Sequence, residues 1–425
     1  MPRQQAVTIM APIKPGAVER LKLLLAGAGQ QPATNAPIPF ERFATTHFAR
    51  FVVLDAATGP DGATVPPRLA YMADVDAPAE RHLDDLVDIA AAGIDSIYGH
   101  CDGYPAGAGI TRAERLAYLR EHQVTVAAIY VNTVGRTLRQ IRQEARLRDA
   151  IQAFLDRSGR EWMGKDPRAA RAAIQRYAYR EESLRWARRS ARGLNLLDRL
   201  RDAAHLVAVP LLLLLLSPLI ILALPLWVVL LRRRERADVP SHERPSAARI
   251  EELAAGEDRV VMNPFCGIGY VKPGRLRYWT AALALWLVNY GARHLYNRGS
   301  LSGVTTIHFA RWVFLDGGRR LIFASNYDGS LESYMDDFID KVSWGLNAVF
   351  SNGVGYPRTD WLVFGGARDE LAFKNYLRTR QLPVQLWYAA YDQLTAINVA
   401  NNARIRAGLY GRMDAEQAAA WLRLL

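Results

Sequence analysis

Residues 47–55 read HFARFVVLD and residues 308–316 read HFARWVFLD, so the two stretches are identical at seven of nine positions. Residues 69–105 also align with residues 321–357 without a gap, and both segments end in Gly-Tyr-Pro. Self-similarity of this extent indicates a duplicated structural unit. The sequence therefore predicts two related units of about 150 residues, one toward each end of the 425-residue chain.

Each unit contains predicted strands and helices in the same order. In the first unit, residues 47–55 and 69–75 alternate and are rich in aromatic and β-branched residues, which predicts two strands joined as a hairpin. Helical spacing follows at residues 79–92. With a strand at 7–13, a helix at 17–25, a strand at 124–131 and a closing helix at 137–154, the order is that of a ferredoxin-like fold. We therefore predict an α+β fold in which two tandem ferredoxin-like repeats bury their open faces together as a pseudo-symmetric α+β barrel.

The middle of the chain has a different composition. Residues 136–202 contain 18 Lys and Arg against 9 Asp and Glu, which is most of the net charge of +12. Residues 206–231 then contain no charged residue, and arginines follow at once. Twenty-six uncharged, leucine-rich residues are enough to cross a hydrocarbon layer of about 30 Å. The sequence therefore predicts a membrane segment. The chain as a whole contains only two cysteines, which excludes a disulfide-built fold.

The membrane segment is predicted to bend. Ser217-Pro218 lies near its middle, and proline disrupts a helix. Both flanks are basic, and basic flanks prefer the cytoplasmic side. A re-entrant hairpin keeps both flanks on one side, whereas a single spanning helix, the alternative, separates the two repeats. We predict a monotopic protein with both repeats on the cytoplasmic face of a bacterial inner membrane.

The predicted organisation has three parts: a first repeat at 1–157, a basic helical segment with the hairpin at 158–258, and a second repeat at 259–425. The basic segment adjoins the apolar one, and such clusters bind anionic lipid. This favours lipid over nucleic acid as the partner. The apolar stretch 278–296, inside the second repeat, is predicted to be either buried core or a second membrane contact.

His47 and His308 occupy equivalent positions in the two repeats. A histidine oriented by a carboxylate can ligate haem iron or act as an acid–base group. The alternative is a structural histidine with satisfied hydrogen bonds. Because side chains alternate along a strand, His308 lies on the opposite face from Arg311.

Arg50 and Arg311 are also equivalent, and each could bind a carboxylate, a phosphate or a haem propionate. The alternative is an ion pair with an acidic helix, through Asp84 and Asp85 or Asp336 and Asp337. Asp76 and Asp328 lie where a strand ends and a helix begins, which favours helix capping over catalysis.

The duplicated architecture resembles the dimeric α+β barrel superfamily, which includes dye-decolourising peroxidases and chlorite dismutases. Residues 325–330, Ser-Asn-Tyr-Asp-Gly-Ser, resemble the peroxidase motif Gly-x-x-Asp-Gly-Thr/Ser, with Ser325 in place of the first glycine. The family's distal arginine lies on a strand, as Arg311 is predicted to do.

The resemblance implies a membrane-attached, haem-dependent, peroxidase-like oxidoreductase that acts on a lipophilic small molecule. In this interpretation His308 is the iron ligand or acid–base group, Arg311 binds an anionic group of the cofactor, and Asp328 is a polar helper. The equivalent candidates in the first repeat are His47, Arg50 and Asp76. The alternative is a non-catalytic module that binds a lipid or another hydrophobic ligand, or that docks a membrane enzyme.

Overall fold

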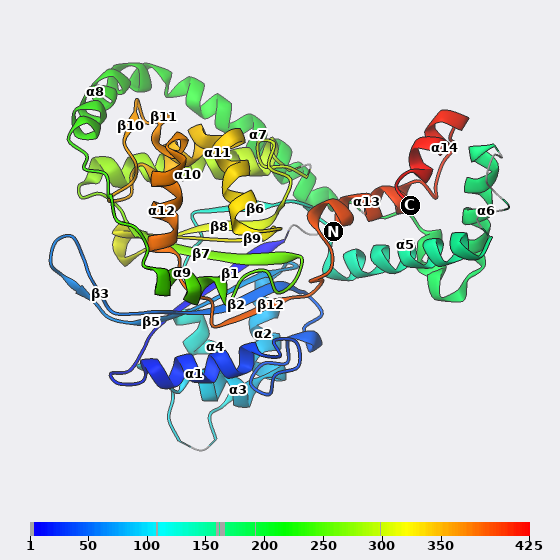
Figure 1. Ribbon diagram of the computed structural model, residues 1–425, viewed down its shortest axis with the longest axis horizontal. Coiled ribbons are helices and arrows are strands. Elements are labelled where there is room, and N and C mark those ends of the chain that lie inside the picture. The colour runs from blue at the N-terminus through cyan, green and yellow to red at the C-terminus, as the bar shows by residue number, and fades with distance from the viewer. Residues whose placement is uncertain (1–3, 108, 159–160, 162–165, 192, 298) are drawn as a thin grey trace.

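Two four-stranded antiparallel sheets lie one above the other at the centre of the molecule, and helices cover their outer faces (Figure 1). The computed structural model describes residues 4–107, 109–158, 161, 166–191, 193–297 and 299–425. The first sheet has the strand order β1-β5-β2-β12 and the second has the order β6-β8-β9-β7. The chain is therefore a mixed α/β protein built on antiparallel sheets.

The strands of the large sheets are β1 (Gln5–Pro12), β2 (Thr46–Leu54), β5 (Arg68–Val75), β6 (Ala128–Val131), β7 (Met262–Tyr270), β8 (Ile307–Leu315), β9 (Arg320–Asp328) and β12 (Leu386–Ala389). Two small hairpins are formed by β3 (Ala57–Thr58) with β4 (Thr64–Val65) and by β10 (Thr359–Asp360) with β11 (Phe364–Gly365). The helices are α1 (Val18–Gly29), α2 (Ala79–Ile89), α3 (Ala91–Tyr98), α4 (Arg112–Glu121), α5 (Leu138–Ser158), α6 (Pro167–Arg180), α7 (Leu196–Leu215), α8 (Ser217–Arg236), α9 (Ala247–Ala254), α10 (Arg275–His294), α11 (Leu331–Phe350), α12 (Glu370–Arg380), α13 (Ala396–Ala407) and α14 (Ala415–Leu422).

The strands and helices predicted for the first repeat are confirmed, with boundaries shifted by a few residues. The expected pairing is wrong in one respect, because the last strand of each repeat lies in the sheet of the other. β6 pairs with β8, and β12 pairs with β2. Alternation of apolar residues identifies a strand but does not specify its partner.

The predicted closed barrel is also corrected, since the described residues form two separate sheets. The connections into β6 and β12 nevertheless touch the sheets that they leave. The Val124 N–H donates to Thr8 O at 2.8 Å, and the Leu382 N–H donates to Cys266 O at 2.8 Å. The two sheets are thus joined along both sides by backbone that crosses between them.

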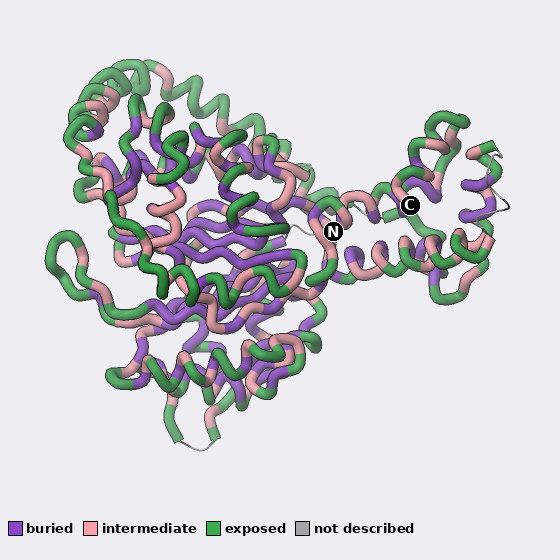
Figure 2. Tube along the Cα trace, viewed as in Figure 1, coloured by how far each residue is buried: buried purple, intermediate pink, exposed green. Residues whose placement is uncertain are grey.

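Three apolar layers stabilise this arrangement. The first sheet packs on α1 to α4 through residues such as Leu21 and Ile97, and the second sheet packs on α10 and α11 through residues such as Leu285 and Met335. Between the sheets, Val52 and Ile322 belong to a third cluster. The sheet strands are buried along nearly their whole length, as Figure 2 shows.

A separate group of helices projects from the sheets (Figure 1). It comprises α5, α6, α13 and α14, which share an apolar cluster of their own that includes Ile151, Ile174, Ile405 and Trp421. Much of the predicted basic segment belongs to this group; its residues 159–160, 162–165 and 192 lie outside the described residues.

α7 and α8 form an arch over α10 and α11 (Figure 1), and we call this helix pair the arch. The two helices meet at Leu216 with a bend of 72°, one residue before the predicted Ser217-Pro218 bend. Among the described residues, no single helix has the length and hydropathy to cross a bilayer, but the bent pair reaches that threshold together. The arch is mostly exposed (Figure 2), and Glu235 is its one buried residue.

Candidate functional site

The two predicted histidines form equivalent buried pairs with the two predicted aspartates. His47 Nε2 lies 3.0 Å from Asp76 Oδ1, and His308 Nε2 lies 2.8 Å from Asp328 Oδ1. The second carboxylate oxygen of Asp76 accepts the Leu138 N–H at 3.1 Å, and that of Asp328 accepts the Ala396 N–H at 2.8 Å. Each aspartate therefore caps a helix as predicted, but the capped helices are α5 and α13 rather than the helices that follow the aspartates in sequence.

The two predicted arginines cross between the sheets. Arg50 donates to Phe265 O at 2.6 Å and to Asn326 Oδ1 at 2.5 Å. Arg311 donates to Val7 O at 2.6 Å and pairs with Asp74. Phe265 and Val7, like Asn326 and Asp74, are equivalent positions of the repeats, so each arginine makes the same contacts in opposite directions.

Neither arginine contacts an acidic helix, so that alternative is wrong. Asp84 pairs with Arg112 instead, and Asp336 pairs with Lys374. Burial lowers the pKa of Arg50 to about 10, which still leaves the guanidinium charged at neutral pH. Both arginines are therefore buried cations held by backbone carbonyls, Asn326 and Asp74.

This buried network does not fit haem. The His308 ring is packed against the rings of Phe48 and Tyr391, and its Nε2 is engaged by Asp328. Neither His47 nor His308 lines any of four cavities that the described residues form. An axial ligand needs open space for the macrocycle, and this site is filled by protein.

A larger cavity lies elsewhere, between α8, α10 and α11 on the outer side of the second sheet. Its volume is about 600 Å³, within the range typical of small-molecule sites. The lining is overwhelmingly apolar, and its larger apolar side chains are Leu224, Trp227, Leu231, Leu283, Leu287, Tyr290, Leu295, Tyr296, Leu301, Trp312, Phe338, Trp344, Leu346, Phe350, Trp361 and Leu362. We call this space the arch cavity.

Polar contacts hold the start of the arch against the end of α10. Asp202 pairs with Arg293 at 2.8 Å, and His205 Nδ1 lies 2.8 Å from His294 Nε2. The hydroxyl of Tyr290, which lines the arch cavity, donates to Leu206 O at 3.2 Å. This end of the arch is therefore fixed to α10 by three separate contacts.

The end of the arch is fixed by buried charges. Glu235, only 2% exposed, accepts hydrogen bonds from Thr359 Oγ1 and the Leu362 N–H, both at 2.7 Å, and from Arg232 Nη1 at 2.6 Å. Burial alone opposes ionisation, but these donors outweigh it and lower the pKa of Glu235. Leu362 has a φ of 64°, so the bond to its N–H fixes a strained turn in the lining of the cavity.

A further group of charged residues lies just after the arch. Asp238 pairs with Lys272 Nζ at 2.7 Å and with the buried Arg277 at the first turn of α10. The start of the arch therefore contacts the end of α10, and Asp238, two residues after the arch, contacts its first turn.

We expect acid to loosen the Glu235 contact. Because the folded-state pKa of Glu235 lies below the ordinary value of 4.5, its stabilisation is complete above pH 4.5 and is lost as the pH falls through the folded pKa. Hydrogen exchange of the Leu362 amide, corrected for its intrinsic rate, should accelerate at least tenfold in Glu235→Gln at pH 7, since bonds to charged groups contribute roughly 1.5–3 kcal/mol. Exchange in that variant should no longer respond to acid. Unchanged exchange at pH 7 would contradict the assignment, and the exposed Glu332→Gln is the control.

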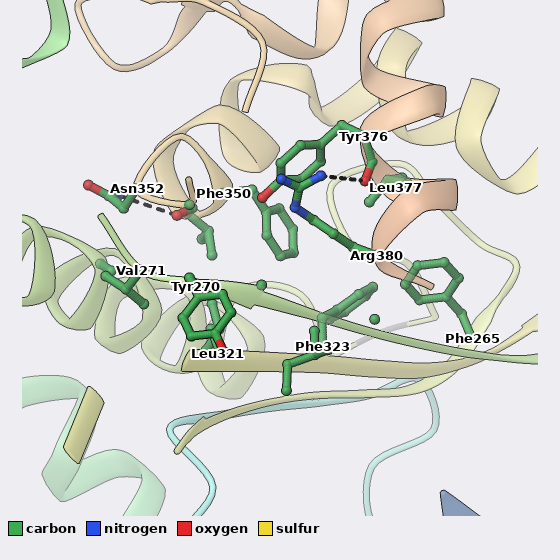
Figure 3. Close-up of a pocket in the computed structure, with 16 residues that line it drawn as sticks. Phe265, Tyr270, Val271, Leu321, Phe323, Phe350, Asn352, Tyr376, Leu377 and Arg380 are labelled. Carbon is green, nitrogen blue, oxygen red and sulfur yellow. Dashed lines mark hydrogen bonds between the residues drawn. The ribbon is translucent and has the colours of Figure 1, made fainter. Parts of the chain in front are cut away.

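A second, smaller cavity lies beside the first, between the second sheet and α11 and α12 (Figure 3). Arg380 lies over the Tyr376 ring at 3.8 Å from its centroid. The volume of about 40 Å³ suffices for a few water molecules and not for a lipid or cofactor. Val349 and Phe350 line both cavities, so this space is a side chamber of the same apolar region.

The outer surface around the arch cavity is also apolar. Along α10, Ala281, Leu285 and Ala292 are buried in the core, whereas Trp279 and Leu287 are exposed. Residues 278–296 were predicted to be either buried core or a second membrane contact. One face of the helix is confirmed as core, and the membrane contact of the exposed face stays a prediction. Further exposed aromatic residues are Trp286, Trp344, Trp361 and Phe364.

Comparisons with protein-family models, with curated proteins and with solved structures gave no match for this chain. The candidate site consequently rests on the geometry alone. Sequence reasoning missed the arch cavity because its walls come from several separate segments spread over residues 224–362. One signal was present: residues 278–296 are unusually apolar and rich in tryptophan and tyrosine for a helix that covers a sheet.

Proposed function

We propose that the chain is a monotopic membrane protein that binds a lipophilic small molecule in the arch cavity. The cavity itself carries the proposal, because a volume of about 600 Å³ with an almost wholly apolar lining suits a hydrocarbon chain. Its roof, α8, exposes large apolar residues such as Leu222 and Leu226, so a ligand could pass from a bilayer into the cavity along an apolar surface.

The exposed leucines of the arch support membrane attachment. Leu215 and Leu222 are 76% and 79% exposed, and sixteen large apolar residues between 206 and 231 are exposed in total. Such a continuous apolar surface far exceeds the scattered exposure of soluble proteins. Because the start of the arch and Asp238, just after its end, both contact α10, the arch enters and leaves the membrane on the side where the bulk of the protein lies. This agrees with re-entrant rather than spanning attachment.

Exposed arginines flank the apolar centre of the arch. Arg199 and Arg201 lie before it, and Arg233, Arg234 and Arg236 lie after it. Basic residues at the membrane surface each contribute about 1 kcal/mol of attraction to anionic lipid. The proposed location is therefore the cytoplasmic face of an anionic membrane, which fits a bacterial inner membrane, and nucleic acid is not the proposed partner.

The proposal favours binding over catalysis. The candidate residues of the oxidoreductase interpretation, His308, Arg311 and Asp328, are buried and hold helices and strands in place. That interpretation therefore remains a prediction without a supporting site.

We also propose that the two sheets are the two copies of a duplicated ferredoxin-like unit. The equivalent strand orders and the matched contacts of Arg50 and Arg311 support this proposal.

A cavity-filling variant tests the binding function. Ala348 on α11 lines the arch cavity, and Ala348→Phe places a ring inside it. We expect affinity for a pyrene-labelled hydrocarbon, measured by quenching of tryptophan fluorescence in amphipol-held protein, to fall about tenfold or more, because overpacking costs roughly 1–3 kcal/mol. Ala26→Phe on the exposed side of α1 is the control. Equal affinity in both variants, at wild-type thermal stability, would contradict the proposal.

A further inference from the structure

One face of α10 exposes a stripe of large apolar side chains. Trp279, Leu283, Trp286 and Leu287 are all exposed, and their spacing places them on the same side of the helix. The helix contains no Asp or Glu, and the exposed Arg275 lies in its first turn. A basic helix with tryptophan and leucine along its free face is typical of helices that lie in a membrane interface.

The tip of the β10–β11 hairpin exposes two further aromatic residues, Trp361 and Phe364, each 54% exposed. Trp361 and Leu362 have φ values of 51° and 64°. Hairpin turns with positive φ usually carry glycine, asparagine or aspartate, and large apolar residues there are strained. Arg232 of the arch pairs with Asp360 and lies over the Trp361 ring, 5.1 Å from its centroid. The hairpin therefore presents apolar side chains at a fixed place beside the arch.

These features distinguish the second repeat from the first. Twelve residues (106–117) separate Gly-Tyr-Pro from Tyr-Leu-Arg in the first repeat, whereas eighteen (358–375) do so in the second, and the longer segment contains the β10–β11 hairpin. α10 has 20 residues, whereas α1, at the equivalent place in the first repeat, has 12. Residues 1–157 contain no tryptophan. The second repeat thus has extra length and extra apolar residues where it adjoins the arch (Figure 1).

The exposed apolar residues of these elements surround the arch cavity. Leu224 of α8, Leu287 of α10, Trp344 of α11 and Trp361 are exposed and also line this cavity, so they are neighbours in space. Arg234, which is exposed, contacts the backbone just before α10. Anionic headgroups attract such arginines, whereas a second copy of this chain would bring another basic surface against them. The charges therefore favour a lipid surface as the partner.

We infer that the exposed stripe of α10 and the tip of the β10–β11 hairpin form a second membrane contact, which lies among the lipid headgroups while the centre of the arch reaches the acyl chains. Tryptophan favours this boundary because its ring is apolar and its N–H is polar. The inference rests on the proposed membrane attachment and adds the surface that seats the body of the protein on the bilayer.

Environment-sensitive dyes on single introduced cysteines test this contact. Both native cysteines are buried, so a thiol-reactive NBD dye modifies the introduced one. Phe364→Cys and Trp279→Cys place the dye at the proposed contact, and neither residue lines the arch cavity. Leu222→Cys on the arch and Leu23→Cys on α1 are the controls.

With anionic vesicles, the dyes at positions 364 and 279 should shift their emission to shorter wavelength. Lipids with a nitroxide near the headgroup should quench them more than lipids with a nitroxide near the end of the acyl chain. The dye at position 222 should show the opposite order, and the dye at position 23 should stay aqueous. In unlabelled protein, Trp279→Ser/Phe364→Ser should lower the partition coefficient about tenfold, because two large side chains lose an apolar environment. Leu23→Ser should leave it unchanged.

Three results would overturn the inference while leaving attachment by the arch intact. The first is an aqueous signal at positions 364 and 279 when the dye at position 222 is quenched. The second is a shift at these positions that occurs only at a high ratio of protein to lipid, which would mean that a second copy covers the surface. The third is an unchanged partition coefficient in the double variant. If the dye at position 222 also stays aqueous, the proposed function fails, and the inference fails with it.

Discussion

The double variant Leu215→Asp/Leu222→Asp is expected to release the protein from membranes. Both leucines are among the most exposed residues of the arch, one on each side of the bend. At the centre of a bilayer, replacing leucine by aspartate costs roughly 3 kcal/mol per residue. Even at a shallower depth we expect at least about a hundredfold fall in the partition coefficient for the pair, since 1.4 kcal/mol corresponds to a factor of ten.

Flotation with vesicles measures this effect. Vesicles of phosphatidylcholine with and without phosphatidylglycerol separate apolar insertion from attraction to anionic lipid. The wild type should float with both and more completely with the anionic ones, whereas the double variant should remain at the bottom of the gradient with both. Leu23→Asp/Leu371→Asp, which changes two exposed leucines on α1 and α12, is the control and should float like the wild type. If the arch variant floats equally well, the arch is not the attachment site.

The elements of the sheets could be predicted from sequence because their signals are local. The alternation at 47–55 and the helical spacing at 79–92 correspond to β2 and α2. The bend near Ser217-Pro218 is likewise a local property of proline. The exchange of β6 and β12 between the sheets has no local signal in the sequence. It depends on which sheet edge each strand reaches after the chain crosses from one sheet to the other.

The candidate site was less predictable for the same reason. Glu235 and Thr359 are 124 residues apart, and neither belongs to a recognisable motif. Repetition directed attention to His47, His308 and the arginines, because duplicated residues stand out in a sequence. In the structure these residues hold helix starts and join the sheets, which are roles that every copy of the unit requires. The residues that recur in both repeats are therefore structural. The arch cavity lies in a part of the second repeat that has no counterpart in the first.

The buried contact between the sheets leads to the largest expected effect on stability. Asp74 pairs with Arg311 and accepts from Asn326 Nδ2 at 3.1 Å. Asp74→Asn preserves the shape of the side chain but leaves the guanidinium groups of Arg50 and Arg311 buried without that carboxylate. Breaking a buried pair in this way costs about 3–5 kcal/mol. We expect a loss of this size in the free energy of unfolding, measured with denaturant in detergent-held protein.

A second change should reverse much of this loss. Asn326 is the equivalent of Asp74 in the other repeat, and its Oδ1 already lies 2.5 Å from Arg50 Nη2. In Asp74→Asn/Asn326→Asp the carboxylate therefore moves to Arg50, and the new amide at position 74 can donate to it, which reverses the native contact. Recovery in the double variant would show that the pair stabilises the interface through charge. A single Asp74→Asn variant as stable as the wild type would contradict the structural role proposed here.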